Sequence, residues 1–219
     1  MNSPRVGRLV VAVVGLLLGS ALAALPGAAD PIGPDCGTCQ GSIYTLTYDG
    51  TPVATDVING TETWRITLTI DTSGYDGGGT LLNAVSIKVS SMLESETLVS
   101  APFVVGGWTE WMGGLNANGC SGSGGGFDCA YAGSTGVAVP NGTYEWVFDL
   151  EMNDDPGTLF TGANLSTIKV RYVDDNGVKV GDLVSENLTL QLIPEPATGA
   201  LVGVGTAALA LRGRRRFEG

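Results

Sequence analysis

The chain has 219 residues, with 22 acidic side chains, 11 basic side chains and no histidine. The lack of histidine excludes Ser-His-Asp and Cys-His catalysis and His-ligated zinc, copper or iron sites. Residues 30–196 contain five basic and 21 acidic residues, a formal net charge of −16, and a surface of this sign repels phosphate backbones and anionic headgroups. We therefore expect no nucleic-acid partner.

The first 23 residues have the three parts of a secretory signal peptide. Two arginines precede an apolar run at residues 9–18, and Ala21-Leu22-Ala23 matches the small-residue pattern of a cleavage site. The apolar run is far shorter than the roughly 20 residues that a membrane span needs. We expect cleavage after Ala23, with a second candidate site after Ala29, and export of the remaining chain.

Alternation of apolar and polar residues predicts one all-β domain over residues 30–193. The clearest strand candidates are residues 63–71, 143–150, 167–173 and 187–192, and weaker ones are residues 43–48, 85–89 and 97–105. Each strong segment has one apolar and one polar face, as expected where a sheet covers a core on one side. About seven to nine such strands predict a single β-sandwich, Ig-like or jelly-roll-like.

Glycine-rich segments predict the connections between these strands. Asp175-Asn176-Gly177 favours a tight hairpin, because Asn-Gly suits the positive φ angles of a type I′ turn. Residues 71–79 contain four glycines and two aspartates and predict a loop. Residues 106–136 predict one long irregular segment, and a loop of that length in a compact domain is usually functional or mobile.

Four cysteines in an exported chain favour two disulfides. Three pairings are open, and the local one, Cys36 with Cys39 and Cys120 with Cys129, is favoured. The first pair forms a C-x-x-C sequence, but a redox centre of that kind needs a βαβ context, so we expect a structural link. The second pair would close the glycine-rich segment and lower the entropy cost of ordering it.

The four tryptophans fall into two pairs. Trp64 and Trp146 lie on apolar strand faces and are expected in the core. Trp108 and Trp111 lie in the long segment with glycines on both sides. Because exposed aromatic rings stack on sugars, Trp108 and Trp111 are the candidate glycan-binding residues, and the alternative is that they cap one end of the sandwich.

The C-terminal segment, residues 194–216, has three parts in order. Pro194-Glu195-Pro196 is followed by an apolar run at residues 197–211 and then by a basic cluster, Arg212, Arg214, Arg215 and Arg216. This arrangement resembles the PEP-CTERM sorting signal of Gram-negative bacteria that make exopolysaccharide. As a helix the apolar run would be about 22 Å long, a short transmembrane helix.

The resemblance implies an exosortase, a membrane-embedded processing enzyme, as the partner that recognises this segment. It also implies a precursor anchored in the inner membrane, with the arginines in the cytoplasm and the β-domain outside. The mature protein is then expected at the cell surface or outside the cell. Exopolysaccharide is a further candidate partner.

These observations predict a non-catalytic surface or matrix protein, with an exopolysaccharide-binding module as the alternative. An enzyme is not expected, because the adjacent pairs Asp154-Asp155 and Asp174-Asp175 point opposite ways on a strand and cannot flank one glycosidic bond. No cofactor or metal is expected. Calcium is the one alternative, at residues 153–155 or at Asp71 and Asp76, although turn formation accounts for most of these aspartates.

Overall fold

The structure is a computed structural model that describes residues 31–89, 93–122, 125–153 and 166–192. The predicted signal peptide at residues 1–23 and the segment at residues 194–216 lie outside the described residues, as do Asp154 and Asp155. The described ranges contain fourteen β-strands and no helix. No helix that could span a membrane is found in the part of the chain that the structure describes. The prediction of an all-β domain is therefore confirmed.

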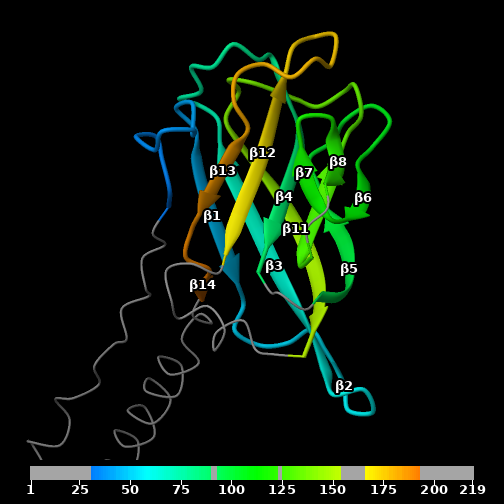
Figure 1. Ribbon diagram of the computed structural model, residues 1–219. Helices are drawn as coiled ribbons and strands as arrows, with labels where there is room; N and C mark the ends of the chain where they lie inside the picture. Colours follow the sequence, from blue (N-terminus) through cyan, green and yellow to red (C-terminus); the bar gives the residue numbers. More distant parts are fainter. Residues whose placement is uncertain (1–30, 90–92, 123–124, 154–165, 193–219) are drawn as a thin grey trace, which may run out of the picture.

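Two large sheets contain most of the strands (Figure 1). In spatial order, the first sheet consists of β14 (Gln191–Leu192), β1 (Ile43–Tyr48), β3 (Thr61–Asp71), β11 (Thr143–Met152) and β5 (Leu93–Ser100), with β2 (Ala54–Asp56) paired to β3. The second consists of β13 (Val184–Asn187), β12 (Thr167–Val173), β4 (Leu81–Lys88), β9 (Phe127–Tyr131) and β6 (Thr109–Met112), with β10 (Val137–Ala138) paired to β4. All described pairings are antiparallel except that of β1 with β14.

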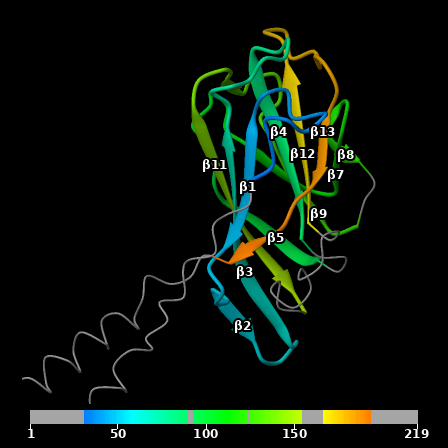
Figure 2. The ribbon, with the colours of Figure 1, turned by 90° about the vertical axis from the view of Figure 1, so that its left-hand side faces the viewer.

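The two sheets face each other and enclose the main core (Figure 2). Alternate residues of β1, β3 and β11 point inward from the first sheet, and alternate residues of β4 and β12 point inward from the second. The largest of these side chains are fully buried: Tyr44, Leu46, Ile66, Leu68, Ile70, Leu82, Ile87, Trp146, Phe148, Leu150, Met152 and Tyr172. This arrangement is that of a β-sandwich. The Ig-like or jelly-roll-like topology stays a prediction.

Three of the clearest alternation patterns and one of the weaker ones predicted their strands closely. Residues 43–48 and 167–173 are β1 and β12, and the segments at 63–71 and 143–150 are each two residues longer in β3 and β11. Residues 187–192 behave differently, because β13 belongs to the second sheet and β14 to the first. The chain crosses between the sheets here, so Leu188 and Leu190 are buried in the core without belonging to either strand.

The prediction of one irregular segment at residues 106–136 was wrong. This stretch contains β6, β7 (Gly114–Asn116), β8 (Gly119–Gly122) and β9. Strand β9 pairs with both β4 and β6 and so continues the second sheet, while β7 and β8 form a separate two-stranded hairpin. The pairing depends on strands far away in the chain, which alternation within the segment does not reveal.

The hairpin after β12 forms, but not through the predicted type I′ turn. The amide of Gly177 donates to the carbonyl of Asp174, and the amide of Asp174 donates to the carbonyl of Val178. Gly177 has a φ of 75°, whereas Gln40 is the only non-glycine with a positive φ in the described ranges. One left-handed residue after the turn is typical of a type I turn with a glycine bulge, so Asn176 needs no left-handed conformation.

Candidate functional site

Both predicted disulfides are present. Cys36 and Cys39 lie in the turn before β1, with Cα atoms 5.3 Å apart, and Cys39 is fully buried in the main core. Cys120 of β8 is joined to Cys129 of β9, with Cα atoms 5.7 Å apart. The second link therefore attaches the β7–β8 hairpin to the second sheet rather than closing an irregular loop.

The β7–β8 hairpin covers part of the outer face of the second sheet. Beneath it lies a second, small core formed by Ala84, Leu115, Cys120 and Cys129, with Tyr131 and Leu183 packed against it. This sheet is therefore apolar on both faces where the hairpin lies. That explains why β4 is buried at six consecutive positions, 82–87, rather than at alternate ones.

A buried arginine connects this hairpin to its surroundings. Arg171 is 5% exposed, and its guanidinium donates to the carbonyl of Ala117 at 2.9 Å, the Oδ1 of Asn83 at 3.0 Å and the carbonyl of Gly177 at 3.2 Å. All three acceptors are uncharged. The arginine therefore joins the tip of the β7–β8 hairpin, strand β4 and the turn after β12 by hydrogen bonds.

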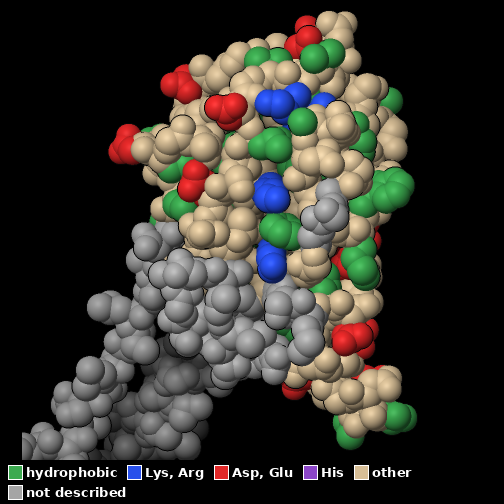
Figure 3. Space-filling model, viewed as in Figure 1, with side chains coloured by type: hydrophobic (Ala, Val, Ile, Leu, Met, Phe, Trp, Pro, Cys, Tyr) green, Lys and Arg blue, Asp and Glu red, His purple; other side chains and the backbone are tan. Residues whose placement is uncertain are grey.

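The few basic residues of the β-domain are concentrated on the second sheet. Lys88, Lys169, Arg171 and Lys179 belong to β4, β12 and the segment after β12, and Figure 3 shows Lys and Arg side chains in a line down this face. The ammonium groups of Lys88 and Lys169 lie 5.4 and 4.6 Å from the centre of the Phe127 ring. The fifth basic residue of residues 30–196, Arg65, lies on the first sheet in an ion pair with Asp149.

The two candidate glycan-binding tryptophans have different surroundings. Trp108 is half-buried against the main core, and its Nε1 donates to the carbonyl of Pro102 at 2.7 Å. Trp111 lies opposite Cys129 in the β6–β9 pair and is 52% exposed. Because Cys129 belongs to the outer core, Trp111 lies on the outer face, whereas Trp108 packs toward the inside. Only Trp111 offers a large part of its ring to solvent.

The described residues form two depressions, one along the connection between β5 and β6 and one at the C-terminal end of β11. The first, of about 630 Å³, is lined by residues 98–108, among which Phe103 is 92% exposed. The second, of about 420 Å³, is polar and lined by Asn59, Thr61, Glu94, Glu151 and Asn153. Its carboxylates already have partners: Glu151 accepts hydrogen bonds from Thr61 and Ser95, which lower its pKa, and Glu94 accepts one from Asn153.

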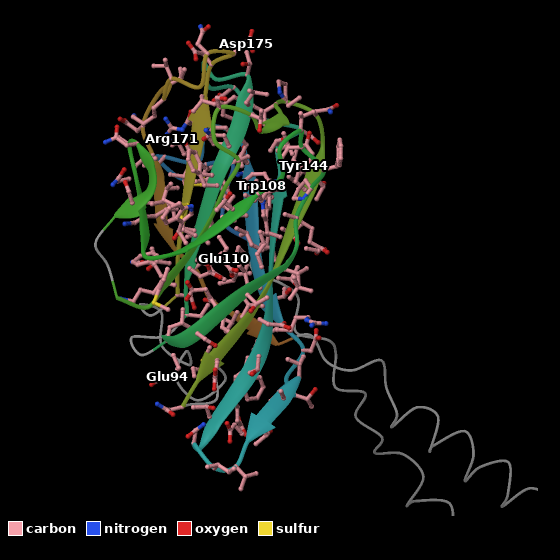
Figure 4. All side chains as sticks on the ribbon, turned by 90° about the vertical axis from the view of Figure 1, so that its right-hand side faces the viewer. Glu94, Trp108, Glu110, Tyr144, Arg171 and Asp175 are labelled. Carbon is pink, nitrogen blue, oxygen red and sulfur yellow. A yellow bond between two sulfur atoms is a disulfide. The ribbon has the colours of Figure 1, made fainter. Side chains whose placement is uncertain are left out.

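Three carboxyl groups meet between the two sheets at the edge formed by β5 and β6. Glu96 of β5 lies opposite Leu150 of the core, and Asp128 of β9 lies opposite Ile87, so both point inward. Glu110 of β6 lies opposite the core residue Ala130 and therefore shares the inward face with Asp128. Figure 4 views the molecule from this edge, with Glu110 near its middle.

These carboxyl groups lack the partners that buried polar atoms usually have. Asp128 is 0% exposed, and neither of its carboxyl oxygens has a hydrogen-bond partner, nor do Oε2 of Glu96 and Oε1 of Glu110. Burial, with a contribution from the charge of Glu110, raises the pKa of Glu96 to about 7. Burial raises the pKa of Asp128 to about 8, and the charges of Glu110 and then Glu96 contribute to this rise. The backbone amide of Cys129 has a smaller effect, which lowers the pKa.

Sequence analysis missed this cluster because none of its members stands out. Glu96 lies two residues before Leu98 in a segment with several polar residues, and Asp128 lies in β9, which has no clear alternation. The one usable signal is Glu96 at the same alternation position as Leu98, which places a carboxyl on an inward face. The approach of β5 to β6 and β9 depends on the packing of the two sheets.

A metal site is not assembled among the residues that the structure describes, since no three Cys, Asp or Glu side chains there are placed to hold an ion. Of the predicted calcium candidates, Asp71 uses its Oδ1 to accept a hydrogen bond from the amide of Ser73 at 2.9 Å. This contact is the turn-forming role expected of aspartate.

Comparison with known proteins identifies the C-terminal segment. A family model described as the PEP-CTERM protein-sorting motif matches residues 192–216. The match includes Pro194-Glu195-Pro196 and all four arginines of the basic cluster, so the resemblance noted in the sequence is confirmed. Its first residue, Leu192, is also the last residue of β14. No match was found among curated proteins or among solved structures.

Proposed function

We propose that this chain, which carries a PEP-CTERM protein-sorting motif at residues 192–216, is a non-catalytic protein of the bacterial cell surface or extracellular matrix. The motif implies an exported, membrane-anchored precursor that an exosortase sorts. The proposal rests on one observation: the motif begins where the last described strand ends. The β-sandwich is then the part that the sorting step delivers.

The motif begins in the sequence at the end of the last described strand. Thr47 and Tyr48 of β1 pair with Gln191 and Leu192 of β14, and only residue 193 separates this pair from Pro194. Proline cannot donate a backbone hydrogen bond, so the ladder cannot continue through Pro194 and Pro196. A processing enzyme would therefore meet the Pro-Glu-Pro sequence next to the edge of the first sheet.

The mass of the mature protein from the native host tests this proposal. Processing should give a chain that ends near Pro194-Glu195-Pro196 and lacks Arg214 to Arg216, whereas a host without exosortase should keep the full signal-peptidase-cleaved chain in the membrane. Replacing both prolines by alanine should have the same effect as removing the enzyme. Arg5 and Arg8 lie outside the motif, so Arg5→Lys with Arg8→Lys serves as the matched control. Intact arginines on native surface-exposed protein would contradict sorting and indicate a permanent anchor.

Carbohydrate binding is the second candidate function, and the exposure of Trp111 favours it. An aromatic ring that is half exposed on a sheet face can stack on a sugar ring. Trp108 has its Nε1 bonded to Pro102 and its ring against the core, so it would support the fold of this region rather than contact the ligand. The proposed contact residue is therefore Trp111 alone.

Binding of the full chain to exopolysaccharide from the native host tests this second function. Trp111→Ala should abolish binding and Trp111→Phe should retain part of it, because the stacking surface is kept. Phe103→Ala is the matched control, since it removes another exposed aromatic ring. A lack of binding, or equal binding by Trp111→Ala and the control, excludes this function. Release of sugars from the same polysaccharide would instead contradict the non-catalytic proposal.

A further inference from the structure

Glu96, Glu110 and Asp128 lie where β5 of the first sheet approaches β6 and β9 of the second sheet. Strand β5 is not hydrogen-bonded to either of these strands. Glu96 comes from the edge strand of the first sheet, and Glu110 and Asp128 come from the last two strands of the second. Strand β5 contacts β6 and β9 here, so the carboxyl groups lie where one edge of the sandwich closes. Four carboxyl oxygens in the cluster are buried without a hydrogen-bond partner.

No basic group faces this cluster from the described strands packed around it. From β4 the inward residue opposite Asp128 is Ile87, while the neighbouring Lys88 lies over the Phe127 ring with Lys169 of β12. On β11 the inward residues are apolar, and the outward Asp149 and Glu151 bond to the first sheet's own side chains. Glu94 of β5 bonds to Asn153.

Asp128 is fully buried without a partner, which is costly for a carboxylate, and the half-buried Glu96 and Glu110 each have one unpartnered buried oxygen. Ionised carboxyl groups at one such site also repel each other. A bound proton removes the charge of a carboxyl and turns one of its oxygens into a hydrogen-bond donor. A proton binds to a single carboxyl group, so the three groups need not converge on one point as the ligands of a metal ion must. Asp128 is the central member, because it is fully buried and the charges of both glutamates act on it.

We propose that Glu96 and Asp128, next to Glu110, form a proton-binding cluster that keeps the β5 edge of the first sheet closed on β6 and β9, and that loss of the protons from Glu96 and Asp128 loosens this edge. The cluster goes beyond the proposed sorting function, because it makes the closure of the exported domain depend on the pH outside the cell. It is independent of the motif at residues 192–216.

The direction of the pH effect follows from the raised pKa values. Well below about pH 4, Glu96 and Asp128 are protonated in both the folded and the unfolded chain. As the pH rises from about 4 toward 8, the unfolded chain releases protons that the folded chain still holds, so stability falls. Above the folded pKa of Asp128 both states are ionised and the loss is complete.

Thermal unfolding of the full chain, purified in a non-ionic detergent, tests the proposal between pH 5 and pH 9. The Tm of the wild type should fall by on the order of 10 °C over this range, and should still fall in 0.5 M NaCl, because buried charges are screened weakly. Asp128→Asn keeps the shape but not the charge, so it should flatten this fall and exceed the wild-type Tm at pH 9. Glu145→Gln removes an exposed carboxylate of β11 and should keep the wild-type slope.

Carbon-13 NMR of the labelled carboxyl groups measures the protons directly and needs no variant. At least one carboxyl should titrate above pH 6 in the wild type, and hydrogen exchange of the β5 and β6 amides should accelerate over the same range beyond the general base-catalysed increase. If Asp128→Asn does not fold, Glu96→Gln takes its place. The proposal is wrong if every carboxyl titrates below pH 6, or if Asp128→Asn and Glu145→Gln have the same slope. It is also wrong if millimolar calcium raises the Tm at pH 8 in the wild type but not in Asp128→Asn, which would assign the cluster to a cation.

Discussion

Trp108 stands edge-on to Trp146, with ring centres 5.3 Å apart and ring planes at 87°. Trp146 belongs to β11 and is fully buried, so this contact fixes the connection between β5 and β6 onto the core of the first sheet. Trp108 also donates a hydrogen bond to the carbonyl of Pro102, which lies in the same connection and is fixed by this bond. The pair thus determines how residues 101–108 pass from one sheet to the other.

Replacing Trp108 by alanine should destabilise the fold. The variant loses the contact with Trp146 and the hydrogen bond to Pro102, so we expect the free energy of unfolding to fall by about 2–4 kcal/mol. Denaturant unfolding of the full chain measures this change. Trp111→Ala is the control and should change the free energy by less than about 1 kcal/mol, because its ring is half exposed. Equal losses in the two variants would contradict the different roles assigned to these rings.

Removing the guanidinium of Arg171 should loosen the β7–β8 hairpin. Arg171→Met keeps much of the buried volume but leaves the acceptors on Asn83, Ala117 and Gly177 without their donor. We expect a loss of about 2–4 kcal/mol in the free energy of unfolding and faster proteolysis within residues 114–122. Lys169→Met, two residues away on β12, is the matched control. Unchanged proteolysis in Arg171→Met would show that the disulfide alone holds the hairpin.

The disulfide between Cys120 and Cys129 should be found in a single peptide. Non-reducing peptide mapping of the exported protein checks this pairing, and a link from either residue to Cys36 or Cys39 would refute it. Replacing Cys120 and Cys129 by serine should lower the free energy of unfolding by about 2–3 kcal/mol, the value for a loop closed over nine residues. Serine replacement of Cys36 and Cys39, which close a loop of three, should cost less.

The turn after β12 should lose stability in acid. The carboxylate of Asp174 accepts hydrogen bonds from the amides of Val178 and Asn176, and these lower its pKa. A lowered pKa adds stability above the unfolded value of about 4, and this stability is lost as the pH falls through the folded value. Asp174→Ala should therefore lower the Tm by about 1–3 °C at pH 7, with a smaller difference at pH 2.5. Asp182→Ala, an exposed aspartate nearby, should show no such pH-dependent difference.

Several features of this protein follow from the sequence alone because they are local. Alternation places β1 and β12 at their observed bounds, since a strand with one buried face must repeat every two residues. The sorting motif is equally local: its prolines, apolar run and arginines occur together in residues 194–216 and agree with the family match. The two disulfides join cysteines close in sequence, and spacing was enough to favour the observed pairing.

Only the tertiary structure decided the features that depend on distant strands. Residues 106–136 form strands because β9 pairs with β4 and the β7–β8 hairpin packs on the outer face, neither of which is encoded within the segment. Glu96, Glu110 and Asp128 are ordinary polar residues in the sequence and become a buried cluster only where two sheets close at one edge. Trp108 and Trp111 look equivalent along the chain, yet Trp108, just before β6, packs on the main core, whereas Trp111 lies on the outer face of β6 and is half exposed.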